Sequence, residues 1–265
     1  MASEEVRHPY GLGPLGQHHP QVSGAAGRTP SLDYTSDMAD FTLYAETLWI
    51  SPYVFSSLVA LREKNATFDV SEVALIDGAN RHSDYHTPSV TGRVPSIDHG
   101  GFRLAESSAI AEYLEEVLPP PAGARLFPAS LRDRARARQI MAWLRSDLAA
   151  LRDDRSTVTM FYRFHLQPLS GQAQRDAERL LRVAEQLVPP GGGPLFGEWS
   201  LVDAELAFML HRLILNGDPV PEGVAEYAKA QWTRPSVREF AEHARPGMVP
   251  ASYWVFSGTP QPKVA

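Results

Sequence analysis

The sequence contains no cysteine among its 265 residues. This absence excludes disulfide bonds, thiolate metal sites and any mechanism that uses a thiol of the protein itself, and it fits a reducing compartment. The chain also lacks an apolar run that approaches the roughly 18–20 residues needed to cross a bilayer. Its first residues include Glu4 and Glu5 and no apolar core segment, which argues against a secretory signal. We therefore expect a cytoplasmic protein with no membrane partner.

An excess of basic charge is also missing. The 25 Lys and Arg residues are outnumbered by 31 Asp and Glu residues, so the formal net charge is −6. A mildly acidic protein repels a phosphate backbone, and we expect no nucleic-acid partner. The neighbouring His18 and His19, and the histidines near Arg81, lack a spacing typical of metal ligands. We predict no metal site.

Shifts in composition divide the chain into five predicted parts. The first is rich in Gly, Pro, His and Ser and has few large apolar residues, which predicts a disordered extension. Three consecutive prolines, Pro119 to Pro121, indicate a linker. The last part carries an aromatic cluster of Tyr253, Trp254 and Phe256. The predicted parts are an extension over residues 1–38, a mixed domain over 39–120, a linker over 121–129, a helical domain over 130–245 and a tail over 246–265.

Alternation and helical spacing predict the order β-α-β-β-β-α in the mixed domain. Gly100 and Gly101 are typical of a hairpin turn between the third and fourth strands. A small mixed sheet covered by helices is a thioredoxin-like arrangement, so the fold class is α+β for this domain. The predicted strands are 41–45, 68–73, 93–97 and 102–104. The predicted helices are 52–64 and one that starts at 106 and ends before Pro119.

After the linker, the apolar residues recur only at helical spacing, which predicts an all-α C-terminal domain. Ser200 and Asp203 form a capping box before the most apolar helix, and a structural role is the preferred interpretation of both. Losing one such cap costs about 1 kcal/mol. The predicted helices are 131–155, 172–187, 201–215, 221–232 and 236–244.

Three helix or strand starts carry the candidate chemistry. Ser51 before Pro52 is a good N-cap, and its hydroxyl can accept from the helix and still donate to a ligand thiolate. Val94 before Pro95 starts a strand; a cis bond there, the minority outcome for such bonds, would turn the Val94 backbone towards an extended peptide. Glu106 and Ser107 open a helix, where simple capping competes with an anion site for a ligand carboxylate.

These motifs, taken in order, resemble a known family. The Ser51-Pro52-Tyr53 helix start, the Val94-Pro95 strand start, the run ESSAIAEYL over residues 106–114 and the later Ser-x-x-Asp box resemble cytosolic glutathione S-transferases. The resemblance covers the chain from about Phe41 to Ala244. The runs 134–148 and 195–199 look like the bacterial YfcF branch of that family.

The resemblance implies a homodimer with glutathione as co-substrate and a glutathione site in the N-terminal domain. By motif position, Ser51 would activate the thiol, Val94 would pair with the cysteinyl backbone with Pro95 beside it in the glutathione site, and Glu106 and Ser107 would hold the γ-glutamyl head. Arg93 is the candidate for the glycyl carboxylate, because the loop from Gly78 to Gly92 lacks the lysine or glutamine of the family pattern. The electrophile pocket would include Tyr53, Trp143, Arg145 and Tyr162.

Two classes of function stay open. One is an enzyme that directs the glutathione thiolate at a small electrophile or reduces a peroxide. The other is a non-catalytic glutathione-binding or stress-response module of the same fold, since one fold serves many functions. Because both Ser51 and the Glu106-Ser107 pair are present, the sequence favours the enzyme. These motifs do not identify the electrophile.

Overall fold

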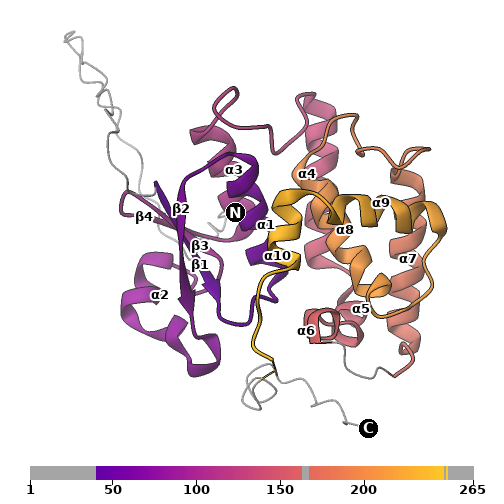
Figure 1. Cartoon of the computed structure of the whole chain (residues 1–265), viewed down its shortest axis with the longest axis horizontal. Helices are drawn as coiled ribbons and strands as arrows, with labels where there is room; N and C mark the ends of the chain where they lie inside the picture. Colours follow the sequence, from indigo (N-terminus) through magenta and orange to yellow (C-terminus); the bar gives the residue numbers. More distant parts are fainter. Residues whose placement is uncertain (1–39, 163–166, 248, 250–265) are drawn as a thin grey trace, which may run out of the picture. The chain divides into compact units, whose positions relative to one another are not determined.

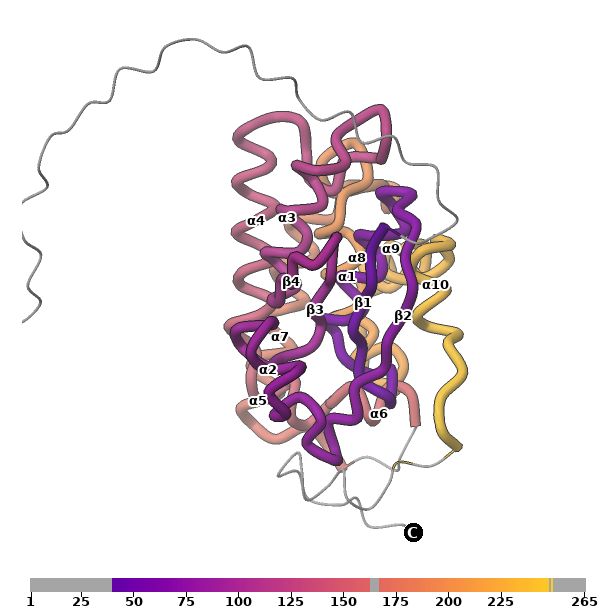
Figure 2. Tube along the Cα trace, turned by 90° about the vertical axis from the view of Figure 1, so that its left-hand side faces the viewer, coloured from indigo at the N-terminus to yellow at the C-terminus, as the bar shows by residue number. Residues whose placement is uncertain are grey.

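A computed structural model describes residues 40–162, 167–247 and 249. It confirms an α+β domain with a four-stranded mixed sheet followed by an all-helical domain. The strand order is β2-β1-β3-β4, and Figure 2 shows the strands in this order with the helical domain behind them. Strand β1 pairs parallel with β2 and antiparallel with β3, and β3 pairs antiparallel with β4. The strands are β1 (Phe41–Glu46), β2 (Phe68–Val73), β3 (Ser96–His99) and β4 (Phe102–Ala105).

The sheet is covered on both faces by helices from its own domain. Helix α2 (Ser83–Ser89) lies on one face, and α1 (Pro52–Glu63) and α3 (Ser107–Val117) lie on the other (Figure 1). The hairpin between β3 and β4 turns at Gly100 and Gly101, whose φ angles of 58° and 89° are the positive values that a two-residue turn of this kind requires. The sequence places the strands well but starts β3 at 93, whereas β3 begins at Ser96.

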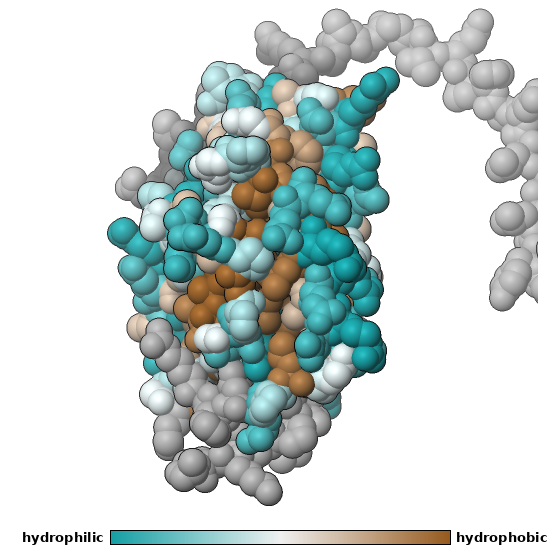
Figure 3. Space-filling view, turned by 90° about the vertical axis from the view of Figure 1, so that its right-hand side faces the viewer, coloured by the Kyte–Doolittle hydropathy of each residue, from teal (hydrophilic) through white to brown (hydrophobic). Residues whose placement is uncertain are grey.

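Seven helices form the second domain in the described part of the chain. The outer face of this domain is largely hydrophilic, with hydrophobic residues visible between the polar ones (Figure 3). The helices are α4 (Leu131–Ser146), α5 (Ala149–Asp154), α6 (Thr157–Tyr162), α7 (Gly171–Leu187), α8 (Leu201–Ile214), α9 (Glu222–Trp232) and α10 (Pro235–Ala241).

The predicted long helix over 131–155 is wrong in one respect, because the chain breaks after Ser146. Leu148 adopts a left-handed conformation with φ of 59°, which an α-helix does not accommodate. Asp147 stabilises the break: its side chain accepts the Leu148 N–H at 2.8 Å, and Arg179 of α7 donates to it at 2.7 Å. Two helices, α4 and α5, therefore replace the predicted one.

Helix α8 is the centre of the helical domain, as its apolar sequence predicts. Asp203 closes the capping box by accepting the Ser200 N–H at 2.9 Å, and it also accepts the Tyr227 hydroxyl at 2.9 Å. One buried core runs through both domains, because α1 packs against α8 and α10 as well as against α3. Core packing therefore fixes the position of Ser51, at the start of α1, relative to the helical domain.

The predicted extension over residues 1–38 lies outside the described residues, as does the aromatic cluster of the tail. No helix in the described ranges is long and apolar enough to cross a membrane.

Candidate functional site

A cleft of about 650 Å³ lies where α1 and α3 begin and where the chain enters β3. Ser51 contributes from the start of α1, Val94 and Pro95 from the residues before β3, and Glu106 and Ser107 from the start of α3. Arg93 lines the same cleft. The structure thus brings three motifs that are separated in the sequence onto one surface.

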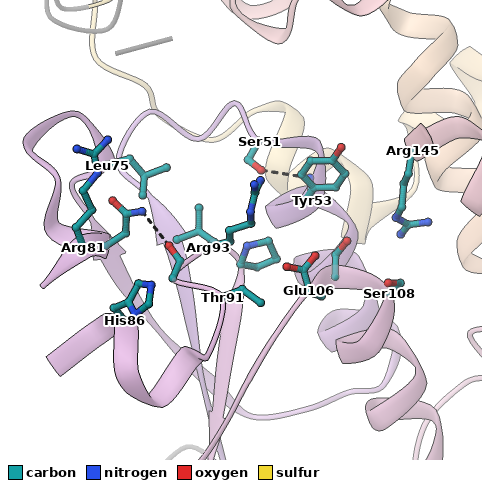
Figure 4. Close-up of a pocket in the computed structure, with 15 residues that line it drawn as sticks. Ser51, Tyr53, Leu75, Arg81, His86, Thr91, Arg93, Glu106, Ser108 and Arg145 are labelled. Atoms are coloured by element: carbon teal, nitrogen blue, oxygen red, sulfur yellow. Dashed lines mark hydrogen bonds between the residues drawn. The ribbon is translucent and has the colours of Figure 1, made fainter. Parts of the chain in front are cut away.

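Ser51 is the N-cap of α1. Its Oγ accepts the backbone N–H groups of Tyr53 and Val54, each at 3.3 Å, and Pro52 occupies the first helical position (Figure 4). These two bonds use the acceptor sites of the hydroxyl and leave its proton to be donated. Because the side chain lines the cleft, a ligand atom there could receive that proton together with the positive end of the helix dipole.

The Val94–Pro95 peptide bond is cis. Val94 lies just before β3 and outside the sheet ladder, and its backbone N–H and C=O have no hydrogen-bond partner within the described part of the chain. A free donor and acceptor on one residue are what an extended peptide needs for backbone pairing.

Glu106 precedes α3 in an uncommon backbone conformation, with φ of 71° and ψ of 110°. Residues held at positive φ without being glycine often mark functional sites. Its carboxylate is exposed and forms no hydrogen bond or ion pair with any described residue. The neighbouring Ser107 is buried at the first turn of α3, where the helix leaves backbone N–H groups free. The pair therefore presents an anion beside a set of donors.

The opposite end of the cleft is basic. Arg81 and His86 line this end, and Figure 4 shows them across the cleft from Glu106 and Ser108, with Arg93 between them and next to Ser51. The His86 ring packs so closely on Gly92 that a Cβ there would lie 2.4 Å from the ring, and Gly92 also has a φ of 62°. From the sequence alone, Arg93 is the only basic residue predicted for the cleft's glycyl-carboxylate site. The short helix α2 brings in His86, and the 3-10 turn Ala79–Arg81 brings in Arg81.

Of the four residues predicted for a second pocket, Tyr53 and Arg145 line the cleft. They also line an adjoining hollow of about 40 Å³ between the domains. Arg145 is held by Glu205 of α8, whose carboxylate also accepts the Ser56 hydroxyl at 2.6 Å. The apolar wall of the hollow consists of Pro52, Phe55, Leu144, Phe208 and Met209.

Trp143 and Tyr162 line neither the cleft nor the hollow. The Trp143 indole donates to Asp147 at 2.9 Å, at the break between α4 and α5. Tyr162 packs beside Leu48, Ile50 and Val158. Burial raises the pKa of its hydroxyl. Helical spacing does not distinguish Trp143 and Tyr162 from residues that line the cleft. It does not reveal the helix break after Ser146, which engages the Trp143 indole and changes the direction of the chain before Tyr162.

The described ranges contain no group of three or more His, Cys, Asp or Glu side chains that could hold a metal ion.

Two family models match the chain. The model of the glutathione S-transferase N-terminal domain matches residues 50–117, and that of the glutathione S-transferase C-terminal domain matches residues 130–245. Among curated proteins, glutathione transferase GST 23 of Zea mays is 33% identical over 52% of this chain and 57% of its own length. Probable maleylacetoacetate isomerase 1 of Drosophila melanogaster is 31% identical over 40% of this chain and 43% of its own length. Across the curated relatives that match, the chain spans between 27% and 63% of the relative's length.

Solved structures align over more of the chain. A glutathione transferase homolog from Burkholderia, solved with bound glutathione, has a TM-score of 0.64 and 39% identity, and the alignment covers 76% of this chain and 96% of that one. A theta class glutathione S-transferase from Xanthomonas axonopodis pv. citri, also with glutathione bound, has a TM-score of 0.63 and 21% identity over 78% of this chain and 99% of that one. At 21% identity, the comparison with the Xanthomonas structure shows a shared fold only.

Proposed function

The chain belongs to the glutathione S-transferase family, and we propose that its cleft binds glutathione and that Ser51 activates the bound thiol. One observation carries the proposal. The Ser51 hydroxyl has a proton left to donate, and it lines a cleft whose two ends have opposite charge.

Each part of glutathione has a matching group in the cleft. The exposed Glu106 carboxylate suits the ammonium of the γ-glutamyl head, and the Ser107 hydroxyl with the free N–H groups of α3 suits the carboxylate on the same carbon. The unpaired backbone of Val94 suits the cysteinyl residue. Arg81 and His86 at the far end, with Arg93 between them and Ser51, suit the glycyl carboxylate.

The free energy needed to stabilise the bound thiolate is moderate. A free thiol has a pKa near 8.5, and lowering it by about two units needs roughly 2.7 kcal/mol. One charge-assisted hydrogen bond supplies about 1.5–3 kcal/mol, and the positive end of α1 adds about 0.3–1 kcal/mol. The hydroxyl and the helix together therefore suffice without a general base, because solvent can take the proton.

Bound glutathione would supply the nucleophilic sulfur. The hollow beside Tyr53 and Arg145 lies next to Ser51, and its apolar wall is suited to a small electrophile. The same site would also serve the reduction of a peroxide, in which glutathione rather than a protein cysteine is the reductant. The alternative is a module that binds glutathione without turnover.

Retention on immobilised glutathione, followed by a conjugation assay and a peroxide assay, separates these functions. The proposal predicts retention and turnover in at least one assay. Binding without turnover in either assay would favour the non-catalytic module, and absence of retention would contradict the proposed site.

We also propose that the protein is a cytoplasmic homodimer of the bacterial YfcF branch. The motifs at 134–148 and 195–199 support the branch. Phe102 on the edge strand β4 is 51% exposed, and a hollow of about 360 Å³ between α3 and α4 is lined in part by Phe127 and Met141. Such apolar surface suits a subunit interface. Light scattering at micromolar concentration tests the dimer: a monomer mass would exclude it.

A further inference from the structure

Glu46, the last residue of β1, holds the loop that leads to Ser51. Its Oε1 accepts the backbone N–H of Ile50 at 2.5 Å and that of Ser51 itself at 2.6 Å. Glu46 does not line the glutathione cleft, but it shares with Ser51 a second cavity of about 190 Å³. The carboxylate thus contacts the backbone of the serine without lining the cleft of the proposed ligand.

The loop between β1 and α1 has an irregular backbone path. Trp49 has a φ of 51°, a conformation that an aromatic residue rarely adopts. Other contacts hold the tryptophan: its indole donates to Glu72 at 2.7 Å, its carbonyl accepts from Arg245 Nε at 2.9 Å, and its ring stacks on His243 with centroids 3.8 Å apart. Among the described residues, only the Glu46 carboxylate accepts the backbone N–H groups of Ile50 and Ser51.

Burial of the Glu46 carboxylate is energetically unfavourable. The residue is 6% exposed, and its Oε2 has no hydrogen-bond partner in the described part of the chain. Burial raises the pKa of this carboxyl to about 7, although the two N–H groups and the nearby Arg245 act in the opposite direction. A buried carboxylate that is only half satisfied opposes folding at neutral pH. Such costs are concentrated at functional sites.

We infer that Glu46 is a positioning residue for Ser51, and this inference rests on the function proposed above. By accepting the N–H groups of Ile50 and Ser51, the carboxylate fixes the backbone from which the Ser51 hydroxyl extends. With that backbone fixed, Ser51 Oγ accepts from Tyr53 and Val54 and its proton points to the cleft. Without Glu46, the hydroxyl would sample orientations that do not meet the sulfur, and kcat would fall while glutathione binding persisted.

A double-mutant cycle at pH 8 tests this inference. Glu46→Ala should lower kcat about tenfold and leave KM for glutathione within about twofold, because the groups that bind the two ends are untouched. In a Ser51→Ala background, the same change should lower kcat less than about twofold, because a positioning residue acts only through the residue it positions. Glu46→Gln retains an acceptor oxygen and should keep kcat within about threefold of the unsubstituted protein. If Glu46→Ala does not fold, Glu46→Asp takes its place in the cycle, since its shorter carboxylate cannot reach both N–H groups.

Asp176 provides a matched control. It is a buried carboxylate whose Oδ2 also accepts two consecutive backbone N–H groups, those of Ala150 and Leu151, and it lies outside the cleft. Asp176→Ala should lower stability and leave kcat within about twofold.

The outcomes separate the two proposals. Equal loss of kcat from Glu46→Ala in both backgrounds, or an unchanged kcat from Glu46→Ala while Ser51 is present, would overturn the role of Glu46 and leave that of Ser51 intact. If Ser51→Ala alone left kcat unchanged, the proposed function would fail, and the positioning role would fail with it.

Discussion

Arg145 of α4 and Glu205 of α8 form an ion pair at 2.5 Å beside the entrance to the interdomain hollow. Glu205 also accepts the Ser56 hydroxyl from α1, so one carboxylate links the N-terminal domain to two helices of the other. Burial raises the pKa of Glu205, and Arg145 counteracts that effect. The pair places a guanidinium where an electrophile would meet the thiol.

Removing Glu205 should therefore destabilise the protein and disturb the electrophile pocket. We expect Glu205→Ala to lower the free energy of unfolding by about 3 kcal/mol, because it leaves a partly buried guanidinium without its partner. KM for the electrophile should rise as Arg145 moves, while KM for glutathione changes little. Denaturant unfolding and steady-state kinetics measure the two effects.

The exposed pair of Arg62 and Glu239 is the control, with the same chemistry at 2.7 Å on the surface. Glu239→Ala should cost no more than about 1 kcal/mol. Equal losses in the two variants would mean that burial does not strengthen the Arg145–Glu205 pair.

The basic end of the cleft should determine affinity for glutathione. We expect Arg81→Ala and Arg93→Ala each to raise KM for glutathione about tenfold, since each removes a charged contact to the glycyl carboxylate, and to leave kcat within about twofold. Arg132→Ala is a suitable control, because Arg132 is exposed on α4 and does not line the cleft. An unchanged KM for glutathione in both cleft variants would mean that the glycyl carboxylate does not bind at this end of the cleft.

Titration of Glu46 should appear in the pH dependence of stability. Its pKa rises from 4.5 to about 7 in the folded protein. The folded form thus keeps this proton to higher pH than the unfolded chain does. The resulting stabilisation is complete below about pH 4.5 and is lost as the pH rises through about 7. The interval from 4.5 to about 7 corresponds to about 3 kcal/mol.

Urea unfolding of the unsubstituted protein and of Glu46→Gln at pH 5 and pH 8 measures this effect. The difference in unfolding free energy between the two proteins should shift in favour of the variant at pH 8. A difference that stays the same at both pH values would show that Glu46 does not titrate in this range.

The features that the sequence predicts correctly depend on local signals. Ser51 before Pro52, the Gly100-Gly101 turn and the box of Ser200 and Asp203 each specify a cap or turn within a few residues, and each is found in the structure. The strand alternation and the apolar runs likewise predict the two domains and their classes.

The features that the sequence does not predict depend on contacts between distant segments. The break at Leu148 is stabilised by Asp147 together with Arg179 of α7, and helical spacing across 131–155 gives no sign of it. The same break engages the Trp143 indole, which therefore lies outside the cleft. Arg81 reaches the cleft through a short turn, and Glu46 contacts the irregular loop before Ser51; neither the turn nor the loop has a periodic signal.

The proposed function depends above all on stabilisation of the glutathione thiolate by the Ser51 hydroxyl. The most direct measurement is the ultraviolet absorbance of the thiolate as a function of pH, with glutathione bound to the unsubstituted protein and to Ser51→Ala at saturating concentration. In the unsubstituted protein, we expect the pKa of the bound thiol to lie about two units below its free value near 8.5. In the variant, we expect that pKa to return most of the way to the free value. The same pKa in both proteins would contradict the assignment of Ser51.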